Sequence, residues 1–101
     1  MNPSSQNRLT VVGPRKDIAR FNQEPIIDAR PGWSDLDLLE ISATRMAWQF
    51  RAPAPPLGFL KQSSLQWPAL TFLLDYDREG RRIKGLAKVK RGKLRHYRVK
   101  Y

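Results

Sequence analysis

Two segments in which apolar and polar residues alternate strictly constrain most what this chain can fold into. Between residues 45 and 51, Met46, Trp48 and Phe50 are separated by polar residues or Ala. A later segment keeps the same period, with apolar residues at Leu70, Phe72, Leu74 and Tyr76. Successive side chains of a strand point to opposite faces of a sheet, so this period predicts strands with one buried face. The fold is therefore expected to contain a sheet that is covered on one side.

Prolines place two helices between the expected strands. Pro14 and the Pro55-Pro56 pair can each open a helix, because the N–H that proline lacks would be unpaired in a first turn. We expect one helix from Pro14 to about Asn22 and another from Pro55 to about Gln66, each ended by a further proline. The residues that these helices are expected to bury are Ile18, Phe21, Leu57, Leu60 and Leu65.

Four further segments are predicted as strands. Arg8 to Val12 is rich in β-branched residues, and Arg81 to Lys90 and Lys93 to Tyr101 are expected to form a C-terminal hairpin. The segment that begins at Ser34 also fits a helix capping box. We favour a strand there, because its leucines alternate with acids and a turn at residues 42–44 would lead directly into the next strand.

The order of elements is βαββαβ followed by a β-hairpin, which predicts a single α+β domain. We expect a ferredoxin-like unit over residues 8–77, a basic C-terminal hairpin over 78–101, a disordered N-terminus at 1–7 and a loop at 24–33. The predicted sheet is mainly antiparallel and six-stranded, with strand order 6-5-4-1-3-2 and two helices on one face.

A family resemblance rests on two stretches of the chain. Asn7-Arg8-Leu9-Thr10-Val11-Val12-Gly13-Pro14 is followed by Asp17-Ile18-Ala19-Arg20-Phe21, and residues 48–80 hold an apolar strand, Pro55-Pro56, a helix, Trp67-Pro68-Ala69-Leu70-Thr71-Phe72 and an acidic turn. These stretches resemble the YubB-like ferredoxin-like family. The family's Trp-Gly-Thr-Lys stretch is absent here. The resemblance implies a ferredoxin-like fold in a small bacterial protein, plasmid- or phage-associated, without an assigned activity, and it supplies no site residues.

The charge of the chain is concentrated at its C-terminal end. Residues 78–101 carry eleven of the nineteen Lys and Arg and one of the nine Asp and Glu, whereas residues 1–77 are neutral overall. Because apolar residues are interleaved with this charge, the segment is expected to fold rather than to form a solvated tail. A concentrated positive charge on folded strands indicates a polyanionic partner.

The pairing within the hairpin decides which side chains it exposes. A four-residue turn at 77–80 and a three-residue loop at 90–92 are expected, and they pair Leu74 with Ile83 and Ile83 with Val99. A two-residue loop would instead mix apolar and basic residues on both faces, so burial favours the first pairing. The inner face is then Ile83, Gly85, Ala87, Val89, Tyr97, Val99 and Tyr101. The outer face is Arg82, Lys84, Leu86, Lys88, Leu94, His96, Arg98 and Lys100.

This pairing places Lys84 opposite Arg98, and like charges directly across two strands destabilise a sheet. A bound polyanion or an acidic patch of the same chain is expected to compensate. Asp35, Asp37 and Glu40 are the candidates for such a patch. Both tyrosines of the last strand point inward in this pairing, so we do not expect them to stack on bases.

We predict a non-enzymatic polyanion-binding protein whose favoured partner is nucleic acid, DNA or RNA, bound with low sequence specificity. The alternative is a phage- or plasmid-derived protein–protein adaptor that binds an acidic host protein. A further alternative without a binding partner is an edge hairpin whose Lys and Arg only prevent edge-to-edge pairing with other sheets. The predicted nucleic-acid-binding residues are Arg82, Lys84, Lys88, Lys90, Arg91, Lys93, Arg98 and Lys100.

Candidate catalytic and metal-binding residues are few. His96 is interpreted as a solvated histidine on a basic face, whose cationic neighbours disfavour its protonated form. Asp75, Asp77 and Glu79 resemble the start of a calcium loop, but Leu86 stands where the bidentate Glu should be. The chain has no cysteine and no apolar run long enough to span a membrane. We expect no enzyme activity, no cofactor, no metal, no membrane partner and a cytoplasmic location.

Overall fold

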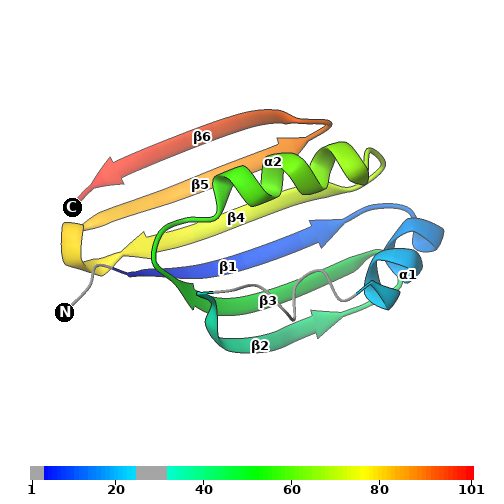
Figure 1. Cartoon of the computed structure of the whole chain (residues 1–101), viewed down its shortest axis with the longest axis horizontal. Helices are drawn as coiled ribbons and strands as arrows, with labels where there is room; N and C mark the ends of the chain where they lie inside the picture. Colours follow the sequence, from blue (N-terminus) through cyan, green and yellow to red (C-terminus); the bar gives the residue numbers. More distant parts are fainter. Residues whose placement is uncertain (1–3, 25–31) are drawn as a thin grey trace.

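The computed structural model describes residues 4–24 and 32–101, which form one six-stranded sheet and two α-helices (Figure 1). The strands are β1 (Ser5–Val12), β2 (Ser34–Ile41), β3 (Arg45–Ala52), β4 (Thr71–Arg78), β5 (Ile83–Lys90) and β6 (Lys93–Lys100). Their order across the sheet is β2-β3-β1-β4-β5-β6, and every neighbouring pair is antiparallel. This is the strand order that the sequence predicted, and the α+β class is confirmed.

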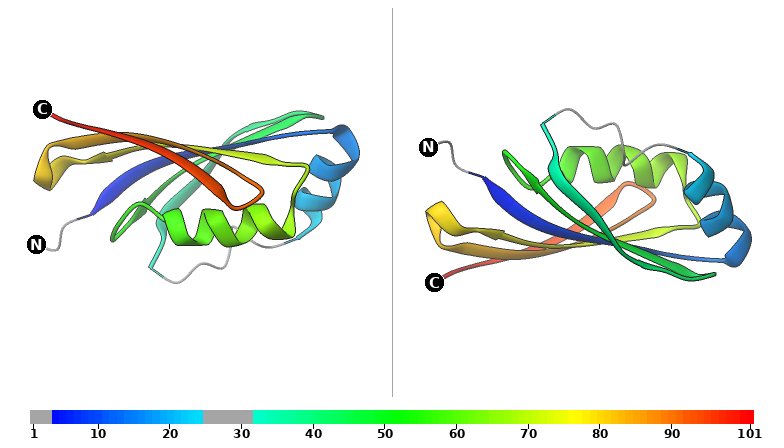
Figure 2. Two further views of the ribbon diagram at one scale, coloured as in Figure 1. Left: turned by 90° about the horizontal axis from the view of Figure 1, so that it is seen from above. Right: turned by 90° about the horizontal axis from the view of Figure 1, so that it is seen from below.

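The helices α1 (Arg15–Gln23) and α2 (Leu57–Gln66) cover one face of the twisted sheet and leave the other bare (Figure 2). The alternating residues of β1, β3 and β4 face the helices and form the core, as predicted. Phe21 of α1 makes edge-on contacts with Trp48, Trp67 and Phe72, at ring-centroid distances of 6.1, 5.3 and 5.8 Å. We call the uncovered side of the sheet the open face.

The tryptophans are packing residues. Trp33 stacks on Phe50 with ring centroids 3.9 Å apart, and Trp48 is buried in the core. In α2, Leu60 is fully buried as expected, but the prediction for Leu65 is wrong, because 62% of it is exposed. The helix lies close to β4 and β5 and buries two small residues, Ser63 and Ser64, in place of Leu65.

The predicted disordered N-terminus at residues 1–7 is wrong for Ser5 to Asn7, which begin β1. β1 lies in the middle of the sheet between β3 and β4, so Ser5 and Asn7 are buried, and both donate side-chain hydrogen bonds. The Ser5 hydroxyl donates to the Ala52 carbonyl oxygen at 3.3 Å, and the Asn7 amide donates to the Ser5 hydroxyl at 3.0 Å.

The segment that begins at Ser34 is a strand, as favoured from its alternation. The loop expected at residues 24–33 lies mostly outside the described residues. The acids of β2 do not balance the hairpin, which corrects that prediction, because β2 and β6 are the two opposite edges of the sheet. Instead, Glu40 pairs with Arg45 at 3.5 Å and Asp35 with Arg51 at 3.9 Å, both on the neighbouring strand β3.

The predicted turn at residues 77–80 is two residues too early. β4 continues to Arg78, a short 3-10 helix spans Glu79–Arg81, and Arg82 takes a left-handed conformation with φ 53° before β5 begins. Leu74 therefore pairs with Ala87 and not with Ile83. Because the shift is an even number of residues, the predicted faces of β5 are preserved.

The predicted pairing of β6 is wrong by one residue. The loop has two residues, Arg91 and Gly92, both at positive φ, and Ile83 pairs with Lys100. A shift of one exchanges the faces of β6. Val99, which we expected to be buried, is 64% exposed on the open face. The expected apposition of Lys84 and Arg98 does not occur either, since Lys84 pairs with Val99.

The predicted pairing of β6 failed because α2 packs on β4 and β5 and does not extend over β6. On the helix side of β6 only Leu94 packs against the core, so burial hardly distinguishes the two pairings there. Turn geometry decides instead, because a two-residue loop with positive φ at both positions matches the twist of a hairpin.

Candidate functional site

The open face of the β5–β6 hairpin carries only basic charge. β5 residues with even numbers and β6 residues with odd numbers share this face, as their pairing shows. Its charged side chains are Lys84, Lys88, Lys90, Lys93 and Arg95. Five of the hairpin's cations therefore lie together on the face of the sheet that no helix covers.

The pairing aligns residues of different strands in rows across the open face. One row runs from Tyr97 on β6 through Leu86 and Asp75 to Arg8 on β1. The next row runs through Arg95, Lys88, Leu73 and Thr10. Neighbouring members of a row lie about 4.8 Å apart, and the two rows lie about 7 Å apart along the strands.

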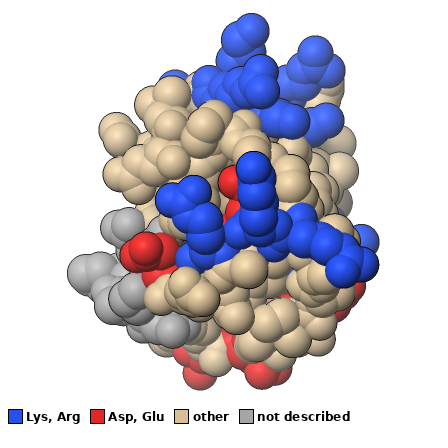
Figure 3. Space-filling model, turned by 90° about the vertical axis from the view of Figure 1, so that its right-hand side faces the viewer, with Lys and Arg blue, Asp and Glu red and all other residues tan. Residues whose placement is uncertain are grey.

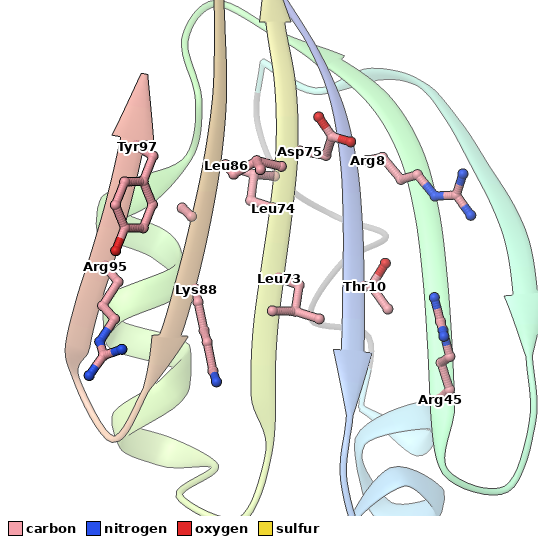
Figure 4. A pocket seen from close by; sticks show the side chains of 11 residues that line it. Arg8, Thr10, Arg45, Leu73, Leu74, Asp75, Leu86, Lys88, Arg95 and Tyr97 are labelled. Atoms are coloured by element: carbon pink, nitrogen blue, oxygen red, sulfur yellow. The ribbon is translucent and has the colours of Figure 1, made fainter. Parts of the chain in front are cut away.

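These two rows line a hollow of about 540 Å³ in the open face (Figure 4). Its floor and one side are apolar, because Leu86 and Tyr97 are 58% and 68% exposed and Leu73 is also partly exposed. Its rim is basic, with residues from four strands. The basic residues of the rim are Arg8, Arg45, Lys88 and Arg95. The hollow thus combines exposed apolar surface with surrounding positive charge.

Asp75 is the single acid that lines this hollow. Among the described residues it has no ion-pair or hydrogen-bond partner, whereas Asp35 and Glu40 each pair with an arginine. Arg8 pairs with Asp75 in the backbone register, but in Figure 4 its guanidinium extends away toward β3. The carboxylate is therefore available to a donor from outside the protein.

A second hollow of about 330 Å³ lies at the tip of the hairpin. Basic residues alone line it: Lys88, Lys90, Arg91, Lys93 and Arg95. Figure 3 views the molecule from this end and shows Lys and Arg gathered over the hairpin at the top. A second basic group lies lower, at the height of α1, and mostly uncharged surface separates the two. On this side of the molecule, positive charge is thus concentrated in two patches.

The eight predicted site residues do not lie on one surface. Lys84, Lys88, Lys90 and Lys93 lie together on the open face, whereas Arg98 and Lys100 lie on the helix side of β6, which corrects their assignment to one surface. Arg82 and Arg91 lie in the two turns that flank β5.

The sequence interpretation missed four residues of the open face: Arg8, Arg45, Arg95 and Tyr97. Arg95 and Tyr97 of β6 were missed because the predicted pairing was wrong by one residue. A two-residue loop at residues 91–92 would have placed both on the open face. Arg8 and Arg45 alternate with buried residues in their strands, so their outward direction was predictable, but their proximity to the hairpin required the strand order.

The tip of the hairpin is fixed to α2. The Gly92 N–H donates to the hydroxyl of buried Ser64 at 2.8 Å. A Cβ atom on Gly92 would lie 2.8 Å from a methyl carbon of Leu65, so the turn lies directly against the helix. This contact positions the basic tip relative to the core.

The other end of the hairpin is held by Tyr101. Its hydroxyl donates to an Asp77 carboxylate oxygen at 2.7 Å, and its N–H donates to the Arg82 carbonyl oxygen at 2.8 Å. The hydrogen bond to Asp77 raises the pKa of Tyr101. Arg82 and Lys84 lie over the tyrosine ring, 5.7 and 5.3 Å from its centroid, and each makes a cation–π contact with it.

His96 is not a solvated residue of a basic face, which corrects that interpretation. It is half-buried on the helix side, and its Nε2 lies 2.6 Å from the Tyr76 hydroxyl in a hydrogen bond. Burial, together with the neighbouring Arg98, lowers the pKa of His96. Burial raises the pKa of Tyr76. Both groups are therefore neutral near pH 7, and the expectation that cations disfavour the protonated histidine is met, with burial as the larger cause.

Comparison of the chain with protein-family models, with curated proteins and with solved structures finds no match. In residues 4–24 and 32–101 there is also no group of three or more His, Cys, Asp and Glu that could hold a metal ion. No helix within that part of the chain is both long and apolar enough to span a membrane.

Proposed function

We propose that this protein binds nucleic acid through the open face of its sheet, in a role that involves no catalysis. The observation that carries the proposal is the concentration of five cations on the open face of the β5–β6 hairpin, with no acid among them. Lys and Arg that neutralise phosphates release bound counterions, and this release drives binding without regard to sequence.

The open face suits nucleic acid better than an acidic protein, because it also exposes an aromatic and several aliphatic side chains between the cations. Nucleic acids present both phosphates and flat apolar bases, and single-strand binders combine basic grooves with aromatic platforms. We also propose a cytoplasmic location, where such a partner is accessible.

The fold is proposed to be ferredoxin-like and related to the YubB-like family. Support comes from the order β2-β3-β1-β4, with α1 between β1 and β2 and α2 between β3 and β4. The hairpin of β5 and β6 extends this unit at one edge and contributes most of the basic surface.

Two double variants with equal charge test the proposed function. Lys88→Gln/Arg95→Gln removes a cross-strand pair from the open face, and Arg98→Gln/Lys100→Gln removes two charges from the helix side of the same hairpin. Binding to labelled single-stranded and duplex DNA is measured by fluorescence anisotropy over a series of salt concentrations.

We expect the open-face variant to bind more weakly and to lose about 1.4 to 1.8 from the slope of log affinity against log salt. The helix-side variant should keep a slope close to that of the parent. A parent that fails to bind at low salt, or equal effects of the two variants, contradicts binding through the open face and favours the adaptor that binds an acidic protein.

A further inference from the structure

We infer that the hollow of the open face holds one unstacked base of a single strand, and that Asp75 favours guanine at this position. The inference rests on the proposed function and specifies its substrate. It is drawn from the row Tyr97–Leu86–Asp75, which places an aromatic ring, an exposed aliphatic side chain and an unpaired carboxylate side by side on three strands.

The apolar part of the row requires a base that is not covered by its neighbours. Leu86 and Tyr97 expose more than half of their surface next to basic residues, so they offer flat apolar contact within reach of phosphates. In a duplex the faces of the bases are stacked on one another, and a protein surface meets sugars and phosphates. An aromatic platform within a basic groove is instead typical of proteins that bind single strands.

The dimensions of the row fit one base. Tyr97 and Asp75 are separated by two strand spacings, about 10 Å, with Leu86 between them. A base that lies on Leu86 can contact the Tyr97 ring on one side and direct a polar edge toward Asp75 on the other. The neighbouring row, about 7 Å away along the strands, presents Lys88 and Arg95 to the phosphates of the same strand.

Asp75 is difficult to explain by phosphate binding alone. A carboxylate repels phosphates and would weaken a surface that only binds the backbone. Arg8 and Lys88 line the same hollow, yet Asp75 forms no ion pair within the described residues. An ionised carboxylate only accepts hydrogen bonds, so N–H donors satisfy it.

Guanine is the base whose Watson–Crick edge presents two adjacent donors, its ring N1–H and its exocyclic amino group, to the two oxygens of a carboxylate. Single-strand binders read bases by hydrogen bonds to this edge. The other bases present one donor there, beside acceptors that the carboxylate repels. Asp75 therefore selects guanine, while the surrounding cations bind the backbone without selection.

The test uses nine-residue DNA strands of dT in which the central base is dT, dA, dC or dG. Anisotropy titrations of the parent should give the tightest binding for central dG, by at least about fivefold over central dT. A duplex of the same length should bind more weakly than the single strands. Tyr97→Ala should weaken single-strand binding about tenfold with an unchanged salt slope, because it removes stacking and no charge.

Asp75→Asn has a matched control in Asp77→Asn, which removes the same charge from the same face of β4 and leaves an acceptor for the Tyr101 hydroxyl. Both variants should bind plain dT strands slightly more tightly than the parent. Only Asp75→Asn should lose the preference for central dG.

Equal affinity of the parent for all four strands overturns the role of Asp75, as does an equal loss of preference in both variants. Duplex binding as tight as single-strand binding, or an unaffected Tyr97→Ala variant, overturns the base-binding hollow. In these cases salt-dependent binding of the parent still supports the proposed function. If the parent binds none of the strands at low salt, both the proposed nucleic-acid binding and the base-binding hollow are contradicted.

Discussion

At the scale of single residues, the contact of Tyr76 with His96 holds the edge strand β6 to the rest of the sheet. The helix α2 does not extend over β6, so this contact takes the place of packing against a helix. Tyr76 on β4 extends across Gly85 on β5 to bond to His96 on β6. The missing side chain of Gly85 makes this possible, since a Cβ atom there would lie 2.2 to 2.3 Å from atoms of the Tyr76 ring and hydroxyl. The glycine thus determines where the edge strand is held.

Gly85→Ala should therefore destabilise the fold by about 1 to 3 kcal/mol, because the tyrosine ring must leave its position. Gly58→Ala is the matched control, since a Cβ atom on Gly58 of α2 meets nothing within 4 Å and alanine favours a helix. Urea denaturation followed by circular dichroism measures both variants. A Gly85→Ala protein as stable as the parent would show that Tyr76 does not occupy this path.

The same contact gives the stability a dependence on pH below neutrality. The pKa of His96 is lowered from its ordinary 6.5 in the folded protein, so the unfolded chain takes up the proton first as the pH falls. Stability is then present above pH 6.5 and is lost progressively below it.

His96→Gln keeps a partner for the Tyr76 hydroxyl but cannot titrate. Between pH 7.5 and pH 5, the parent should lose more unfolding free energy than this variant does, as measured by urea titrations at each pH. Equal losses in the two proteins would mean that His96 contributes nothing to the pH dependence.

At the scale of elements, the β5–β6 hairpin depends on its turn and on the contact of that turn with α2. Arg91 and Gly92 adopt φ values of 52° and 76°, and the Gly92 N–H bonds to Ser64. Arg91 is an unfavourable residue for this conformation, in which Asn is preferred. Arg91 therefore makes the turn less stable than Asn would at this position.

Arg91→Asn should raise the unfolding free energy by about 0.5 to 1 kcal/mol and weaken binding to nucleic acid slightly. Gly92→Ala should lower it by about 1 to 3 kcal/mol, because the added Cβ atom is strained at positive φ and approaches Leu65. Thermal denaturation compares the two variants with the parent. If Gly92→Ala is harmless, the turn does not lie against α2 as described.

The sequence predicted those elements whose faces differ clearly in burial. Phe72 and Leu74 on β4 are buried beneath helices while Leu73 and Asp75 are not, so the period of two gave the correct face. On β6 apolar and basic residues occur on both sides and only Leu94 reaches the core, so burial could not select the register. The two-residue turn that sets the register has Arg91 at positive φ in place of the Asn that usually marks such a turn, so the sequence did not favour it.

At the scale of the whole molecule, charge is separated across the sheet. The acids Asp35 and Glu40 lie on the β2 edge and pair with arginines of β3, while the hairpin at the other edge carries a dense group of cations without ion-pair partners among the described residues. The charge of the last segment was evident in the sequence. Its distribution over two faces was not, because the face of each β6 residue depends on the turn. Arg8 and Arg45 join the site only through the strand order.

Chemical footprinting of lysines tests the central claim most directly, because lysines lie on both sides of the sheet. The protein is methylated with and without a single-stranded oligonucleotide at low salt, and the modification of each lysine is measured by mass spectrometry. Binding through the open face predicts protection of Lys84, Lys88 and Lys93, with unchanged reaction at Lys100 and at Lys16 of α1. Protection of Lys100 and Lys16 with free reaction of the open-face lysines would contradict it.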